Sequence, residues 1–111
     1  MIPDPSPPFD LSMRGIAEDQ IRDLVRRAKQ ARRALVVQVQ LIEILNELKM
    51  NPRGFGDIYC TYRMLDMEGF LALRHHLIVS YSVHRRLPMV NLMSMTPASD
   101  HPLYPENPNE M

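Results

Sequence analysis

Histidine and arginine side chains have the clearest chemical potential in this sequence. His84 is followed directly by Arg85 and Arg86, which makes a basic turn. Such a turn is usually solvated, and otherwise it contacts a phosphate group or an acidic partner, because guanidinium groups bind those anions through charge-assisted hydrogen bonds. His75 and His76 are adjacent, and neighbouring side chains of an extended chain point to opposite faces. The pair therefore predicts polar turn residues, and we expect no metal site.

A second group of cations gathers in one short segment. Six basic residues and one acid, Asp23, fall between positions 22 and 33. A solvated helix face is the default interpretation of such a segment. The alternative is a docking surface for an acidic partner or for nucleic acid. The arginines that would form this partner-binding surface are Arg22, Arg26, Arg27, Arg32 and Arg33.

The other reactive residue types point to no chemistry. Cys60 is the only cysteine, so the chain cannot form an internal disulfide or a cysteine-rich zinc site. The motif Gly54-Phe55-Gly56 lacks the third glycine and the strand-to-helix context of a dinucleotide site, and we expect no cofactor. Tyr59 and Tyr62 precede Arg63, a composition found on binding surfaces, but sheet packing is the favoured explanation of the tyrosines.

Length and composition limit the remaining functions. The 111 residues suit one domain, and 13 basic and 13 acidic side chains give zero formal net charge. A dedicated nucleic-acid binder usually carries a basic excess, so bulk electrostatic binding is not expected. No basic or apolar leader is visible at the N-terminus, and no apolar run approaches the ~20 residues that span a bilayer. We expect a cytoplasmic protein without a membrane partner.

Prolines divide the chain into a body and two ends. Four of the ten prolines fall within positions 1–8, and four within 96–111. Proline lacks a backbone donor and biases the residue before it toward extended geometry. We therefore expect an N-terminal arm over 1–8, one folded domain over 9–95 and a C-terminal tail over 96–111.

Two helices are predicted in the first half of that domain. Positions 17–30 carry apolar residues at helical spacing, with Glu18 and Asp19 in the first turn, where acids complement the helix dipole. Positions 33–50 carry a second apolar stripe. One unbroken rod would be about 50 Å long, so we expect a break between the two and an antiparallel pair. The side chains predicted to be buried are Leu24, Val25, Leu35, Val39, Ile42, Leu45, Val79, Tyr81 and Val83.

Strand patterns occupy the rest of the domain. Positions 9–13 alternate apolar and polar residues, and after a loop at 53–57 the sequence becomes strand-like, with turns at 74–76 and 85–88. Helices followed by strands indicate an α+β fold. We predict the order β-α-α-β-β-β, with an antiparallel helix pair packed on one face of a small antiparallel sheet.

The order of these elements and several short motifs resemble the RelE/ParE toxin superfamily. The shared features are the helix exit Leu45-Asn46-Glu47-Leu48 with Asn51-Pro52, the glycine-bearing loop at 53–57, and the apolar strand that reaches Tyr81. The resemblance covers positions 9–96 and is greater to the ParE-like, plasmid-stabilisation members than to the ribosome-dependent nucleases. It implies a toxin-like component of a type II toxin–antitoxin system, with an antitoxin protein as its partner.

The resemblance weakens where nuclease members carry their catalytic residues. Ile78 and Val79 stand where those members have an arginine before the tyrosine, and the last predicted strand, 89–95, has no Arg, Lys, His or Tyr. This departure leaves enzymatic activity open but favours action by protein binding. The remaining catalytic candidates for a nuclease are Arg63, Arg74, His84 and Arg85.

Three functions stay open at this point. The first is a ParE-like toxin that binds a protein target such as DNA gyrase. The second is a RelE-like endonuclease that cleaves messenger RNA on the ribosome. The third is a non-toxic interaction module that keeps the fold. An antitoxin is the expected partner of the first two, and a homodimer is also open.

Overall fold

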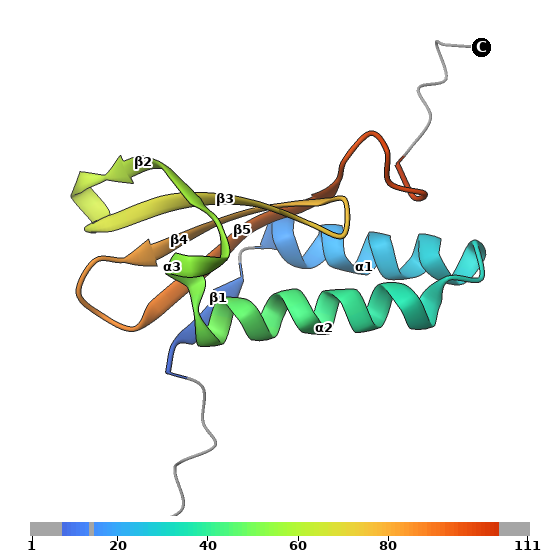
Figure 1. Cartoon of the computed structure of the whole chain (residues 1–111), viewed down its shortest axis with the longest axis horizontal. Helices are drawn as coiled ribbons and strands as arrows, with labels where there is room; N and C mark the ends of the chain where they lie inside the picture. Colours follow the sequence, from blue (N-terminus) through green and yellow to red (C-terminus); the bar gives the residue numbers. More distant parts are fainter. Residues whose placement is uncertain (1–7, 14, 105–111) are drawn as a thin grey trace, which may run out of the picture.

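The computed structural model describes residues 8–13 and 15–104 and has an α+β architecture, as predicted. Helices lie in one layer and the strands in another (Figure 1). No helix within these residues is long and apolar enough to cross a membrane. The elements in chain order are β1 (Asp10–Met13), α1 (Gly15–Gln30), α2 (Ala34–Met50), α3 (Pro52–Phe55), β2 (Asp57–Tyr62), a 3-10 turn (Arg63–Leu65), β3 (Met67–Arg74), β4 (Leu77–His84) and β5 (Met89–Pro97).

The five strands form one mixed sheet in the order β1-β5-β4-β3-β2. The last four strands of the chain pair antiparallel, whereas β1 pairs parallel with β5. The predicted wholly antiparallel sheet is therefore wrong. The physical reason is that β1 finds its partner in the last strand, after the helix pair, and not in a neighbouring hairpin.

The predicted order β-α-α-β-β-β also contains one strand too few. β2 and β3 are separate strands, joined by the 3-10 turn and by Asp66 in a left-handed conformation with φ 54°. Glu68 and Gly69 lie inside β3 and do not interrupt it. Glycine suits position 69 because a Cβ atom there would lie only 2.5 Å from the Cys60 sulfur on the paired strand.

The helix pair forms as predicted. α1 ends at Gln30 and α2 begins at Ala34, and the two run antiparallel beside one another (Figure 1). Arg32 reverses the chain with a positive φ of 58°, and the amide of Arg33 donates to the Ala28 carbonyl at 2.7 Å. This left-handed residue marks the break without any glycine or proline.

A single-turn helix, α3, replaces part of the loop predicted at 53–57. Asn51 caps it by accepting a hydrogen bond from the amide of Gly54 at 3.3 Å, and Pro52 occupies its first position. The turn at 74–76 is a tight hairpin in which His75 and His76 both have positive φ, 55° and 60°. The predicted polar turn at these histidines is confirmed.

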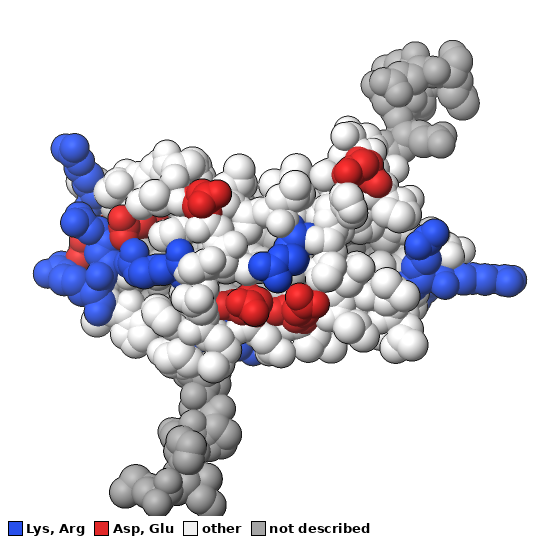
Figure 2. Space-filling view, in the orientation of Figure 1, with Lys and Arg blue, Asp and Glu red and all other residues white. Residues whose placement is uncertain are grey.

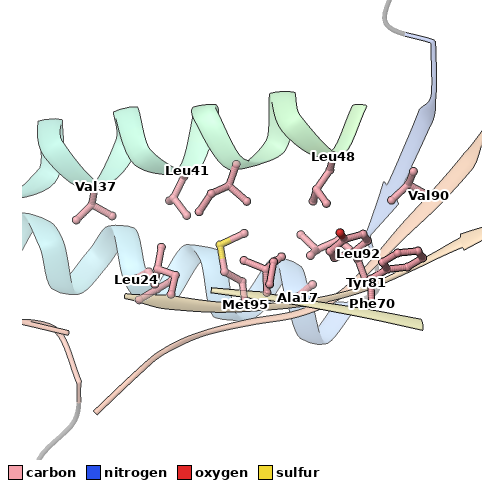
Figure 3. Close-up of a cluster of buried hydrophobic side chains, with 14 of the residues drawn as sticks. Ala17, Leu24, Val37, Leu41, Leu48, Phe70, Tyr81, Val90, Leu92 and Met95 are labelled. Atoms are coloured by element: carbon pink, nitrogen blue, oxygen red, sulfur yellow. The ribbon is translucent and has the colours of Figure 1, made fainter. Parts of the chain in front are cut away.

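The core lies between the helix pair and one face of the sheet. Figure 3 shows side chains from both layers meeting there, with Leu24 and Leu48 from the helices and Tyr81 and Leu92 from the strands. Of the residues predicted to be buried, Leu24, Val79, Tyr81 and Val83 are within this core. Val25 and Leu45 pack against it and are partly buried.

The predicted core face of α2 is wrong. Leu35, Val39 and Ile42 are 75%, 56% and 58% exposed. The buried residues of α2 are Val37, Leu41, Ile44 and Leu48. Both sets are apolar and both follow helical spacing, so the sequence pattern alone cannot distinguish the core face from the outer face.

The chain remains folded beyond position 95. β5 continues through Pro97, and His101 and Leu103 are 6% and 7% exposed. The His101 Nδ1 atom accepts a hydrogen bond from the amide of Leu103 at 2.9 Å, and Arg27 donates to the Leu103 carbonyl at 3.2 Å. The predicted N-terminal arm, apart from Pro8, and the end of the predicted tail lie outside the described residues.

We expect the stability of this segment to depend on pH through His101. Burial lowers the pKa of His101 below its usual 6.5, because the charged ring would lose its hydration. The nearby His76 and Arg33 lower this pKa further, whereas the Asp100 carboxylate raises it in part. The unfolded chain therefore binds the proton more readily, and the stabilisation by neutral His101, complete above pH 6.5, is lost as the pH falls below that value. Chemical denaturation at pH 7.5 and pH 5 should show this loss.

The matched variant is His101→Asn, whose amide oxygen keeps an acceptor at the position of Nδ1 for the Leu103 amide but does not titrate. The difference in unfolding free energy between the two pH values should be smaller in His101→Asn than in the parent chain. An equal difference in both proteins would assign the pH dependence to other groups.

Candidate functional site

The four nuclease candidates do not form one site. Arg74 is the last residue of β3 and pairs with Leu77, whereas His84 ends β4 and pairs with Met67 at the opposite end of β3. β3 has eight residues, which span roughly 23 Å at ~3.3 Å per residue. Arg74 is therefore too far from His84 to act on the same bond.

Arg74 has a structural role. Its guanidinium carbon lies 4.8 Å from the centre of the Phe55 ring, and its Nη1 atom lies 3.4 Å from a Glu43 carboxylate oxygen. His75 Nε2 lies 3.0 Å from the other oxygen of Glu43. These contacts tie the end of β3 to α2 and α3.

The other candidates gather at the far end of the sheet. We call the four arginines there, with the carboxylates that pair with them, the basic tip. Figure 2 shows basic side chains clustered at that end of the molecule. The basic tip consists of Arg53, Arg63, Arg85, Arg86, Asp66 and Glu68.

Most of the basic tip is held by internal ion pairs. Arg86 contacts Asp66 at 2.6 Å, Arg85 lies 3.9 Å from the same carboxylate, and Arg53 contacts Glu68 at 2.6 Å. Arg63 makes no salt bridge to any residue in the described part of the chain and is exposed. The tip can therefore attract an anionic group, but its cations are partly neutralised.

His84 is engaged in the turn through one of its ring nitrogens. Its Nδ1 atom accepts hydrogen bonds from the amides of Arg86 and Leu87 at 3.1 and 3.0 Å. This arrangement requires Nδ1 to be unprotonated, so the neutral ring carries its proton on Nε2. His84 shapes a shallow pocket of about 220 Å³ with Arg53, Arg85 and Arg86, which could receive a phosphate-sized anion.

The five arginines predicted to bind a partner divide into two groups. Arg26 and Arg27 pair with Asp23 on the same helix, and Arg22 lies 3.7 Å from Asp19. The hydrogen bond from Arg26, with the charges of both neighbouring arginines, holds the pKa of Asp23 below its usual value. These three cations are locally compensated.

Arg32 and Arg33 are the uncompensated members of the five. They lie in the turn between α1 and α2 and are exposed, and neither makes a salt bridge within the residues that the structure describes. A partner surface on this side of the molecule would therefore meet the helix turn and not the length of α1.

A surface that sequence reasoning missed lies on the sheet face away from the helices. We call Leu71, Leu73 and Ile78, which are 46%, 66% and 36% exposed, the sheet patch. Leu73 pairs with Ile78 across β3 and β4, and the three residues line a pocket of about 400 Å³ together with Asp57, Ala72 and Ala98. The sequence signal for an apolar outer sheet face is the run Phe70-Leu71-Ala72-Leu73, in which the residues on both faces of the strand are apolar.

Tyrosine hydroxyls lie beside this patch on the edge strand β2. The Tyr59 hydroxyl is 3.4 Å from that of Tyr62 and 3.5 Å from the Ser80 hydroxyl. The hydrogen bond with Tyr59 and then that with Cys60 raise the pKa of Tyr62, so the phenol stays protonated at neutral pH. The described residues contain no cluster of three or more potential metal ligands.

Comparison with known proteins identifies the fold. No family model matches the chain, and no curated protein matches it. Among solved structures, the chain is similar to one in the crystal structure of the archaeal RelE–RelB complex from Pyrococcus horikoshii OT3. The TM-score is 0.57 and the sequence identity 14%, and the alignment covers 84% of this chain and 98% of that one.

This chain has the fold seen in that RelE–RelB structure. The fold that the sequence resemblance implied is thereby supported. The two structures share the helix pair and the sheet, but a sequence identity of 14% does not show that they share functional residues. The dispersed arginines and His84 remain the findings that bear on activity.

Proposed function

We propose that this chain is the toxin-like subunit of a type II toxin–antitoxin pair and that it acts by binding a protein, in the manner of ParE. The observation that carries the proposal is that Arg74 and His84 occupy opposite ends of β3. A nuclease needs its acid, base and phosphate-binding groups around one reacting bond. A toxin that works by binding has no such requirement. The proposed setting is the cytoplasm, and the proposed target is DNA gyrase.

The antitoxin is proposed to bind across the sheet patch and the free edge of β2. β2 is an edge strand, and its Ile58 and Tyr59 are 51% and 53% exposed. An extended segment can add to such an edge through main-chain hydrogen bonds while its side chains fill adjacent pockets. The pocket of about 400 Å³ beside Leu71 and Leu73 would receive an apolar side chain of that segment.

Electrostatics supports an acidic antitoxin. Arg32, Arg33 and the basic tip place positive charge at both ends of the molecule, although the total charge is zero (Figure 2). Complementary charge should raise the association rate more than the affinity, and salt should slow association.

Co-expression with any short reading frame found beside the gene tests the proposal. We expect the two chains to purify together, expression of this chain alone to arrest growth, and Leu73→Asp to weaken the complex by about tenfold or more, since a charge would enter an apolar contact. Affinity is measured by calorimetry and association by stopped flow at low and high salt. The matched control is Met64→Asp, because Met64 is 99% exposed and lies outside the sheet patch.

Two results would contradict parts of the proposal. Separate purification together with harmless expression would leave the non-toxic interaction module. Equal weakening by Leu73→Asp and Met64→Asp would remove the sheet patch as the antitoxin site.

The basic tip favours a second candidate, the RelE-like endonuclease. Its pocket of about 220 Å³ and its guanidinium groups suit an RNA phosphate. We nevertheless expect no cleavage when the purified chain is incubated with messenger RNA, with or without ribosomes. Specific cleavage that is lost in Arg63→Ala or Arg85→Ala would overturn the binding proposal in favour of this candidate.

A further inference from the structure

The outward face of α2 is apolar. We call Leu35, Val39 and Ile42 the outer stripe; their side chains are each more than half exposed. At 100° per residue they lie roughly opposite the buried Val37 and Leu41. No charged residue occurs anywhere in positions 34–42. Figure 2 shows largely uncharged surface along this half of α2, with acidic groups toward the middle of the molecule and basic groups at the helix turn.

The neighbouring helix shows that this pattern is particular to α2. α1 buries Ala17, Leu24 and Ala28, and its solvent face is rich in charge, including Asp19 and Arg22. α2 is apolar on two faces, and an apolar helix face is normally buried against another element. The outer stripe stays more than half exposed in the described part of the chain, so no element described there covers it.

We propose that a second copy of this chain binds to the outer stripe, with the two α2 helices packed antiparallel about a two-fold axis. The axis would pass near the middle of the stripe, close to Val39. Leu35 of each copy would then lie against Ile42 of the other, and Val39 would lie near its own equivalent. Such an isologous contact closes on itself and produces a dimer. This proposal goes beyond the toxin function and does not depend on it.

The charges that flank the stripe favour a second copy in this orientation. Arg32 and Arg33 precede the stripe, and Glu43 and Glu47 follow it. In the antiparallel arrangement, Arg33 of one copy lies between Glu43 and Glu47 of the other along the helix axis, within about one turn of 5.4 Å from each. A parallel arrangement would instead place arginine against arginine. Glu43 also contacts Arg74 and His75, but its side chain remains 46% exposed.

The size of the stripe sets the expected strength. A stable interface buries about 800 Å² on each partner, and one short helical stripe supplies only part of that area. We therefore expect a weak dimer with a dissociation constant on the order of micromolar.

Sedimentation equilibrium of the full chain over a wide concentration range tests the proposal. We expect a reversible monomer–dimer equilibrium that Val39→Lys shifts at least tenfold toward monomer. The matched control is Met64→Lys, an exposed apolar residue elsewhere on the surface, which should leave the equilibrium unchanged. Arg33→Glu should weaken the dimer, and Arg33→Glu combined with Glu47→Arg should restore it. Circular dichroism of each variant confirms that the fold is retained.

A cysteine at the axis gives an independent measurement. In a Cys60→Ser background, Val39→Cys should form a disulfide-linked dimer under mild oxidation, because the two thiols would meet near the axis. Met64→Cys in the same background should cross-link much more slowly. The proposal is overturned if the chain stays monomeric up to its solubility limit, or if Val39→Lys leaves the monomer–dimer equilibrium unchanged. It is also overturned if the outer stripe proves to be covered by an antitoxin helix that excludes a second copy.

Discussion

Replacing Ile44 with alanine should lower the free energy of unfolding by about 2–5 kcal/mol. Ile44 is fully buried in the core between α2 and the sheet. Truncation removes apolar contacts and leaves a cavity that the rigid sheet beneath it cannot close. The measurement is chemical denaturation followed by circular dichroism, with the free energy taken from the midpoint and slope of the transition.

Ile42→Ala is the matched control, because the same substitution is made two positions away on the same helix. Ile42 is 58% exposed, so its truncation should change the stability of the monomer by much less, within about 0.5 kcal/mol. The comparison should be made at low concentration, where a dimer through the outer stripe is dissociated. If Ile42→Ala proved as costly as Ile44→Ala, the assignment of the core face of α2 would be wrong.

Replacing Tyr81 with phenylalanine should destabilise the fold by about 1–3 kcal/mol. The Tyr81 hydroxyl donates a hydrogen bond of 2.6 Å to the carbonyl of Pro52, and the side chain is fully buried. The ring stacks on Phe70 with 5.4 Å between the ring centres. Phenylalanine keeps this stacking but leaves the Pro52 carbonyl without its buried donor.

The same bond connects the sheet to α3. Burial raises the pKa of Tyr81 to about 12, so the hydroxyl remains protonated and can donate throughout the neutral range. Tyr59→Phe serves as the control, since Tyr59 is 53% exposed and its nearest hydroxyl is 3.4 Å away. Thermal or chemical unfolding should show a clear loss for Tyr81→Phe and almost none for Tyr59→Phe. Equal losses would mean that the Pro52 contact does not stabilise the protein.

Local chemistry made much of the fold predictable. The change from helical to strand spacing predicted an α+β chain, and the polar pair His75-His76 between two strand patterns predicted the hairpin turn. The break between α1 and α2 was predicted from length, because a single helix of that size would have had no partner. The element patterns and the hairpin depend on residues close together in the sequence, whereas the break depends on the combined length of the two helical patterns.

The candidate site was less predictable because it depends on long-range placement. The sequence could suggest Arg63, Arg74, His84 and Arg85 as residue types suited to phosphate chemistry. It could not show that Arg74 and His84 would occupy opposite ends of one strand, since their separation is set by the pairing of β3 with β4. The ion pairs of Arg85 and Arg53 likewise join segments that are distant along the chain.

The sequence by itself determined the α+β class and the hairpin, because the spacing of apolar residues and the conformational preferences of turn residues act locally. It determined the helix break through the length of the two helical patterns. Only the tertiary structure decided which face of α2 is buried and that β1 pairs parallel with β5. α2 has two apolar faces with the same helical spacing, so the choice between them depends on the shape of the sheet and of α1. The pairing of the first strand with the last depends on where the helix pair places the rest of the chain relative to β1. No local sequence pattern encodes that placement.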